Sequence, residues 1–264
     1  MAASGRVADR LRATLRRGGL YYSGLYVART MVDRLRDRMD GRLAAIERRN
    51  HVIEPWSISA RRFTAADNRA LWNTYDWSRR GEEWTRDSCS KERVVTELLE
   101  PNVPSGSVAL EVGPGGGRWT DILRQRASRL LIVDVADRAL ELCRERFNGC
   151  SNIEYLLTDG RTLAVADSTV DAIWSYDVFV HINPPDTRSY FREFGRVLKP
   201  RGRAVIHHPG DGPTKGQRPG WRSDLTASMV AEFCRESGLR IVHQTRELVN
   251  EGDALSVIEK IASM

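Results

Sequence analysis

Three glycines and two acids mark the part of the chain whose residue types fit ligand binding through the backbone. Gly113, Gly115 and Gly117 follow an apolar run that contains Glu111, and Asp134 closes the next apolar run. A glycine-rich turn lets a ligand approach the backbone closely, because glycine has no Cβ. An acid that ends the following strand is placed to accept hydrogen bonds from both hydroxyls of a ribose. The pattern therefore predicts a site for an adenosine-containing cofactor.

The position of the third glycine bears on which cofactor fits. Dinucleotide-binding turns have the spacing G-x-G-x-x-G/A, which from Gly113 and Gly115 would require a small residue at position 118. That position holds Arg118, and the glycine comes one residue earlier, at Gly117. The spacing therefore disfavours a turn that binds a dinucleotide pyrophosphate.

Histidines follow two later strand candidates. His181 comes after the predicted strand 170–175 and the acid Asp177, and His207 and His208 end the next predicted strand. In open α/β sheets, ligands bind beyond the carboxyl ends of the strands. A histidine there can serve as the general base for a hydroxyl group, which is barely ionised at pH 7. These four residues are our candidate catalytic residues.

Strand geometry separates the two adjacent histidines. Successive side chains of a strand point to opposite faces, so only one of His207 and His208 can face the site. We predict His208, which shares a face with Ala204 and Ile206, and we expect His207 to pack under a helix. His181 is compatible with a structural hydrogen bond as well as with catalysis.

A metal site is the alternative for the same residues. Asp177 and His181 are spaced i, i+4, so a helical turn would present both on one side, where a strand-edge histidine could join them around a divalent ion. Magnesium prefers oxygen ligands, and the sequence places no second carboxylate nearby. We therefore expect no metal ligands, although magnesium remains the alternative.

The segments around these residues alternate between strand and helix patterns. Such alternation requires a largely parallel sheet that is covered by helices on both faces. The predicted strands after the glycine turn are 130–133, 153–157, 170–175, the strand that ends at 208, 240–247 and 254–261, and the predicted helices are 118–127, 137–147, 186–198 and 226–237.

Taken in order, these features resemble the class I S-adenosylmethionine-dependent methyltransferases, whose first motif is acid-x-Gly-x-Gly-x-Gly. The resemblance covers roughly residues 105–262 and includes the turn 196–202, in which Arg201 stands where the family usually has glycine. It implies a Rossmann-like, doubly wound α/β sheet of seven strands in the order 3-2-1-4-5-7-6, with the last strand antiparallel. It also implies S-adenosylmethionine as the cofactor.

The same resemblance assigns roles to the cofactor-binding residues. The three glycines and Glu111 would surround and orient the methionine part, and Asp134, followed by Val135, would hold the ribose. Asp159 would accept from the adenine amino group, with Gly160 beside it, and Ser175 ends the fourth strand at the same edge.

The histidines at the acceptor side favour a hydroxyl acceptor over a carboxylate, which needs no base. Sugar O-methyltransferases resemble this chain in carrying polar catalytic residues at the same two strand ends. We therefore expect O-methylation of a sugar or oligosaccharide hydroxyl, as in a precursor of a methylated polysaccharide. The alternatives are a phenolic or polyketide small molecule and, less favoured, RNA. Against a nucleic-acid substrate, the Asn/Asp-Pro-Pro-Tyr/Phe motif of many base methyltransferases does not follow the fourth strand.

Two segments precede the expected catalytic domain 105–264. Residues 1–50 hold 12 arginines and 5 acids, a charge of +7, and contain the stripe Met31, Leu35, Met39, Leu43 and Ile46 of an amphipathic helix. We expect this stripe to pack on the catalytic domain or on a second subunit of a homodimer, with peripheral contact to an anionic membrane as the alternative.

Residues 51–104 are expected to form a helical lid that carries four of the seven tryptophans. Most tryptophan rings in such a segment pack in the protein core. Trp77 and Trp84 are the better candidates for contact with a substrate. The loop from Pro209 to Arg222 resembles a substrate lid.

The composition fits a cytoplasmic enzyme with one catalytic domain. The 264 residues can form one α/β core with an extension. The four cysteines form no C-x-x-C pair and no metal-ligand array, which is typical of reduced thiols. The sequence has neither a run of about 18 apolar residues nor the pattern of a signal peptide.

Overall fold

The computed structural model describes residues 25–50 apart from 26, 30, 33 and 48, and then residues 57–85, 88–211, 222–250 and 252–262. Most of the loop predicted to be a substrate lid, residues 212–221, lies outside the described residues.

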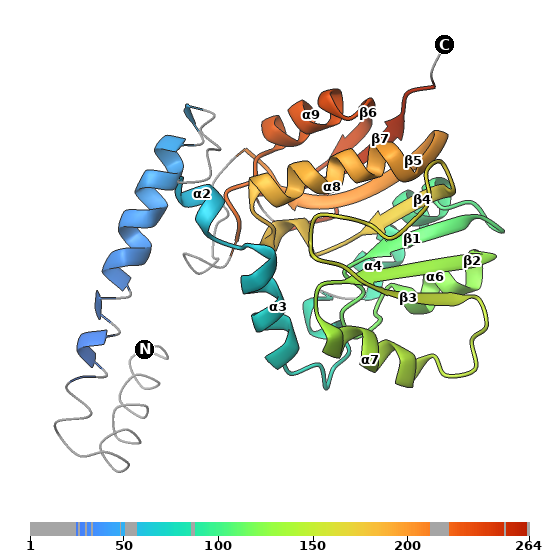
Figure 1. Cartoon of the computed structure of the whole chain (residues 1–264), viewed down its shortest axis with the longest axis horizontal. Coiled ribbons are helices and arrows are strands. Elements are labelled where there is room, and N and C mark those ends of the chain that lie inside the picture. Colours follow the sequence, from blue (N-terminus) through green and yellow to red (C-terminus); the bar gives the residue numbers. More distant parts are fainter. Residues whose placement is uncertain are drawn as a thin grey trace.

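The centre of the protein is one seven-stranded sheet in the order β3-β2-β1-β4-β5-β7-β6, as predicted (Figure 1). Strands β3, β2, β1, β4 and β5 are parallel neighbours, and β7 runs antiparallel to both β5 and β6. The strands are β1 (Val108–Val112), β2 (Arg129–Asp134), β3 (Ile153–Leu157), β4 (Val170–Ser175), β5 (Leu198–Pro209), β6 (Leu239–Thr245) and β7 (Asp253–Lys260).

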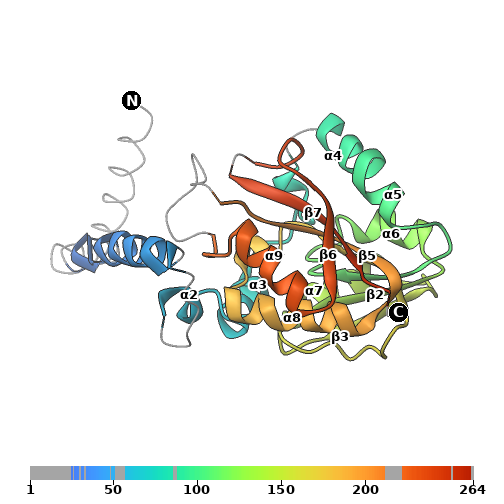
Figure 2. The same ribbon diagram turned by 90° about the horizontal axis from the view of Figure 1, so that it is seen from above.

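Helices cover both faces of this sheet, because the central strands are apolar on both sides. Helices α4 (Ser88–Val94) and α6 (Thr120–Arg126) lie on one face, and α8 (Pro184–Val197) and α9 (Ala227–Glu236) lie on the other (Figure 2). Helix α7 (Asp137–Arg146) packs against β2 and β3. The predicted helices therefore match the observed ones to within about two residues, the usual uncertainty of helix ends.

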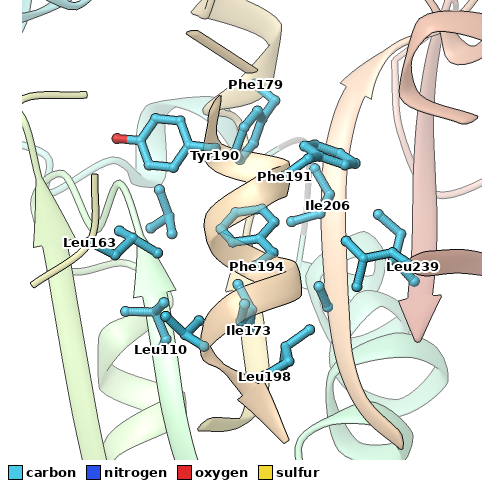
Figure 3. Packing of buried hydrophobic residues seen from close by; sticks show 14 of the residues in the cluster. Leu110, Leu163, Ile173, Phe179, Tyr190, Phe191, Phe194, Leu198, Ile206 and Leu239 are labelled. Atoms are coloured by element: carbon cyan, nitrogen blue, oxygen red, sulfur yellow. The ribbon is translucent and has the colours of Figure 1, made fainter. Parts of the chain in front are cut away.

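The alternation of strand side chains builds two separate cores. Leu110 of β1 and Ile173 of β4 are neighbours that point toward α8, where Phe191 and Phe194 fill the space above them (Figure 3). Trp174, one residue along β4, belongs to the cluster on the opposite face. This packing fixes the level at which each strand ends, and therefore which residues reach the edge of the sheet.

The start of α8 shows how the sequence ends a loop at that edge. Asn183 is the N-cap of the helix, and its side-chain oxygen accepts from the backbone N–H of Asp186 at 2.8 Å. Pro184 and Pro185 follow in the first turn, where their missing N–H groups cost no hydrogen bond. The cap places the segment 176–183 between the ends of β4 and α8.

Ahead of β1, α3 (Ala65–Thr74) and the 3-10 turn η1 (Glu82–Trp84) lie over the carboxyl ends of the strands, and α2 (Ile58–Arg61) packs against α8. Helix α4, the π-turn η2 (Val95–Leu99) and α5 (Glu100–Asn102) follow along the face of the sheet that α6 covers. Thr64 and Asp67 form a capping box at the start of α3, and Asp186 accepts from the N–H of Ala65 at 3.1 Å. Arg69 donates to the carbonyl of Val135 at 3.0 Å, so α3 is tied to the end of β2.

A further helix precedes these elements and stands at the side of the domain (Figures 1 and 2). Residues 34–47 form it continuously, and the described residues between 25 and 32 are helical too. We call the described residues 25–50 the N-terminal helix. Its contacts with the α2 region include a hydrogen bond from the N–H of Ile58 to Glu47 at 2.7 Å and an ion pair of Asp40 with Arg62 at 3.9 Å. Among the described helices, none is both long enough and apolar enough to cross a membrane.

Candidate active site

A cavity of about 300 Å³ lies at the carboxyl ends of β1, β2 and β4. The glycine turn, Asp134 and the segment after β4 form its floor, and α3 and η1 form its roof. Its position is the one that the strand order predicts, because ligands of open α/β sheets bind beyond the strand ends.

The first two glycines of the turn line this cavity and could not be replaced without a shift in the structure. Gly113 has φ +74° and Gly115 has φ +54°, the left-handed region that favours glycine. A Cβ at Gly115 would lie 2.6 Å from the indole of Trp77, and one at Gly113 would lie 2.4 Å from Val178. Gly117 turns the chain against Phe147 and does not line the cavity.

The two acids of the motif lie at different depths. Asp134 lines the cavity with only 8% of its surface exposed, and it accepts from the N–H of Ala136 at 2.9 Å. Burial raises the pKa of Asp134 to about 6. Glu111 lies deeper, accepts from the hydroxyl of Thr120 at 2.6 Å, and has its pKa raised to about 8 by burial. Asp134 can therefore contact a ligand directly, whereas Glu111 supports the turn from below.

The remaining cofactor candidates divide in the same way. Val135 and Gly160 line the cavity. The carboxylate of Asp159 instead accepts from the N–H groups of Thr162 and Arg161, which hold its pKa below the usual range. The hydroxyl of Ser175 donates to the carbonyl of Val112 at 3.0 Å. Asp159 and Ser175 therefore shape the turns beside the cavity, and neither lines it.

Of the three candidate histidines, only His181 lines the cavity. It ends the 3-10 turn η3 (Phe179–His181), and its ring lies 5.3 Å from that of Trp72. Asn68 of α3 donates to the His181 carbonyl at 2.7 Å, which fixes the turn.

The preferred candidate, His208, lies on the other face of β5. Its ring is fully buried, with Nε2 2.8 Å from the Ser256 hydroxyl and Nδ1 2.7 Å from the Pro209 carbonyl. Burial lowers the pKa of His208 to about 4. This ring is held in a neutral structural role, and it does not reach the cavity.

His207 faces the other way and lies in a buried group of charges. Its Nδ1 lies 2.9 Å from Asp177 Oδ1, and its Nε2 lies 3.3 Å from Asp253 Oδ2. Arg118 pairs with the same Asp177 at 2.5 Å, and Arg222 pairs with Asp253 at 2.7 Å. Asp177, Arg118 and Arg222 line the cavity, so this charge group forms part of its wall.

The place of Asp253 and the role of Arg118 were not predicted from the sequence. Asp253 begins β7, which runs antiparallel to β5, so it pairs with the last residue of β5, Pro209. This pairing brings Asp253 to the ligand-binding edge of the sheet. The order of the last two strands is therefore the signal that could have identified Asp253.

Three tryptophans close the cavity from the roof. Trp72, Trp77 and Trp84 line it and pack against one another with ring centroids 5.7 to 6.1 Å apart. The indole N–H of Trp77 donates to the carbonyl of Trp72, and that of Trp72 donates to Asn68. The rings therefore support each other and also offer apolar surface to a ligand.

The described residues contain no group of three or more His, Cys, Asp or Glu side chains that could hold a metal ion. Asp177, the acid proposed for the alternative metal site, has its two carboxylate oxygens in contact with His207 and Arg118.

The comparisons with known proteins agree with this geometry. A family model described as a methyltransferase domain matches residues 110–206. Methyltransferase GfsG of Streptomyces halstedii is 30% identical over 156 residues, which cover 56% of this chain and 52% of that protein. A demethylmenaquinone methyltransferase of Tropheryma whipplei is 33% identical over 123 residues, which cover 47% of this chain and 46% of that protein. The chain thus spans about half the length of these curated relatives.

Solved structures share the fold at lower identity. A SAM-dependent methyltransferase from Aquifex aeolicus matches with a TM-score of 0.56 and 20% identity, over 71% of this chain and all of that one. A putative methyltransferase of Haloferax volcanii, solved with the Trm112 methyltransferase activator, matches with a TM-score of 0.61 and 17% identity, over 75% of this chain and 98% of that one.

Proposed function

We propose that this chain, which carries a class I S-adenosylmethionine-dependent methyltransferase domain, methylates a hydroxyl group of a sugar or an oligosaccharide. The observation that carries the proposal is that Asp134, His181 and the three indole rings of the roof line one cavity. A ribose-binding acid, a candidate base and a surface for an acceptor are thereby brought together.

The residues of the glycine turn fit the cofactor. The backbone at Gly113 and Gly115 is open to a ligand where a Cβ would collide with neighbouring side chains, and the buried Asp134 can accept from two ribose hydroxyls. When bound, S-adenosylmethionine supplies a methyl group on a positively charged sulfur. The role of the protein is then to align the acceptor and to remove its proton.

His181 is the best candidate for the base. A sugar hydroxyl needs a base at pH 7, and His181 is the candidate histidine that reaches the cavity. Asp177 also lines the cavity, but His207 and Arg118 hold its pKa well below its usual range despite burial. A carboxylate with so low a pKa accepts a proton poorly, and it is better suited to holding its neighbours in position.

The cavity wall favours a saccharide acceptor. Indole rings pack well against the apolar face of a pyranose, and Trp72, Trp77 and Trp84 supply such surfaces. Arg118 and Asn250 line the same cavity and carry donors for acceptor hydroxyls. An aryl acceptor would use the indole rings but would make less use of these donors.

A transfer assay tests the proposal. The full chain is incubated with cofactor that carries a labelled methyl group and with separate panels of saccharides, phenols and RNA. We expect label in saccharides, and the loss of that label in the Asp134→Ala variant. Label in phenols alone or in RNA alone would refute the acceptor class and leave the methyltransferase assignment standing.

A further inference from the structure

A small side pocket of about 30 Å³ adjoins the cavity. Trp84, Arg118 and Asp177 belong to the walls of both, so the two are direct neighbours. Asp134 and the glycine turn line the cavity and do not line the side pocket. The side pocket therefore lies on the acceptor side of the site, away from the residues that fit the cofactor.

The size of the side pocket limits what it can hold. A water molecule needs about 10–15 Å³ of cavity volume on this measure, so the side pocket has room for roughly two or three atoms of that size. The two oxygens of a carboxylate match this space, whereas a sugar ring is too large for it. The side pocket therefore fits a substituent of an acceptor and excludes a second sugar unit.

Two cations line the side pocket. The side chain of Arg118 is 5% exposed and that of Lys91 is 22% exposed. Their charged groups lie over the same indole, that of Trp119, with Arg118 Cζ 5.2 Å and Lys91 Nζ 5.7 Å from the ring centroid. Thr85 and Ser90 add hydroxyl groups to the wall. A negative group in the side pocket would lie beside both cations and reduce their mutual repulsion.

Two acids already pair with these cations, and both pairings leave donors for a ligand. Glu82 accepts from Lys91 Nζ at 2.5 Å but does not line the side pocket. Asp177 lines it, and its two carboxylate oxygens contact Arg118 and His207. Within the described part of the chain, Arg118 uses two of its five N–H groups in hydrogen bonds, and Lys91 uses one of its three. Most of the charged donors can therefore serve a ligand.

We propose that the side pocket binds a carboxylate of the acceptor, and that the acceptor is an acidic saccharide such as a uronic acid. This inference rests on the saccharide acceptor proposed above and narrows it. Lys91 and Arg118 hold the carboxylate through charge-assisted hydrogen bonds. A hydroxyl of the same sugar then lies in the cavity that His181 lines. The carboxylate is an anchor, and the hydroxyl is the group that is methylated.

Matched pairs of acceptors test the proposal. The probes are the methyl glycosides of glucose, galactose and mannose and those of the corresponding uronic acids, each incubated with the full chain and labelled cofactor. We expect kcat/KM for a uronate to be at least about tenfold higher than for its neutral partner, because a hydrogen bond to a charged group contributes that much or more. The label should resist mild alkali, as a methyl ether does. A label that alkali removes would indicate a methyl ester and would overturn the anchoring role of the carboxylate.

Lys91→Met tests the side pocket itself. The partner Glu82 is 42% exposed, so this change leaves no buried acid unpaired. We expect the preference for uronates to fall at least about tenfold, and the charge-conserving Lys91→Arg to keep most of it. The matched control is Lys199→Met, which removes an ion pair of 2.7 Å with Asp171 at the opposite edge of the sheet and should leave the preference unchanged. Circular dichroism should show all three variants folded.

The possible failures are distinguishable. Equal kcat/KM for neutral and acidic partners, or an unchanged preference in Lys91→Met, would overturn the proposal and leave saccharide methylation standing. Weaker cofactor binding by Lys91→Met in calorimetry, with an unchanged uronate preference, would overturn it in favour of the carboxylate of the cofactor. The absence of label from every saccharide would refute the proposed function, and this inference with it.

Discussion

The Nδ1 atom of His207 lies 2.9 Å from the Oδ1 atom of Asp177, which lines the cavity. His207 lies in β5, Asp177 follows the neighbouring strand β4, and β7 adds Asp253 on the far side of the ring. Burial alone would lower the pKa of His207, but the two carboxylates outweigh it and raise that pKa. The strand order therefore produces a buried histidine between two acids, which raise its pKa.

This pairing predicts a pH-dependent loss of stability in the His207→Gln variant. Because the folded pKa of His207 lies above its unfolded value of 6.5, its contribution is fully present below that pH and is lost as the pH rises through the folded pKa. Denaturant unfolding should show a cost of about 3–5 kcal/mol at acid pH, and a smaller one at alkaline pH. The exposed His243→Gln, which removes no ion pair of this buried group, is the control. An equal cost at both pH values would contradict the raised pKa of His207.

Glu111 predicts the opposite pH dependence. Burial raises its pKa from 4.5 to about 8, so the carboxyl is protonated in the folded state and stability falls as the pH rises between these two values. Glu111→Gln keeps the shape and cannot ionise. Without cofactor, the variant should match the unaltered chain near pH 5 and exceed it by up to about 4 kcal/mol above pH 8. Denaturant unfolding at both pH values measures this, and a variant that is less stable at high pH would refute it.

Asp134→Ala should weaken cofactor binding. A hydrogen bond to a charged group contributes about 1.5–3 kcal/mol, which corresponds to roughly 10- to 150-fold in affinity. Because the pKa of Asp134 is about 6, the affinity of the unaltered chain should also fall as the pH drops below that value. Calorimetry measures both effects, with Asp167→Ala, a 75% exposed carboxylate, as the control. Unchanged affinity in Asp134→Ala would refute the ribose assignment.

The sequence predicted the sheet order and the closeness of the glycine turn to Asp134, but not which histidine faces the cavity, and the reason is local. The glycine turn and Asp134 are adjacent in the fold because β1 and β2 are consecutive, parallel neighbours. The choice between His207 and His208 depends instead on which face of β5 lies beside Asp177 and Asp253. That is decided by the pairing of β5 with β4 and β7, which lie far apart in the chain. Alternation placed the two rings on opposite faces, but it could not show which face adjoins the cavity.

The apolar stripe of the N-terminal helix gives a second example. Its spacing predicted a helix, because periodicity is a property of the segment alone. What covers the stripe depends on surfaces outside the segment. The structure adds the inward position of Asp40 and Glu47, which the linear order of charges did not show.

Gly115→Ala should prevent a ligand from approaching the backbone of the glycine turn. Alanine at φ +54° is strained, and its Cβ would lie 2.6 Å from Trp77. Gly149→Ala is the matched control, because Gly149 has φ +87° and open space around it. Gly149→Ala should lose about 1–2 kcal/mol of stability and Gly115→Ala at least as much, and only Gly115→Ala should lose cofactor affinity in calorimetry. Similar affinities for the two variants would contradict the assigned role of the turn.

His181→Ala should remove most of the turnover while cofactor binding stays intact. A positioned general base contributes about 10²- to 10⁴-fold in rate, and His181 is the candidate histidine on the cavity wall. Single-turnover methyl transfer with saturating cofactor isolates this step from binding, and calorimetry confirms that the cofactor still binds. Exposed His243→Ala should behave like the unaltered chain. If His181→Ala keeps its rate within about tenfold of the unaltered chain, the proton is taken by another group, and the two remaining histidines are then tested in the same way.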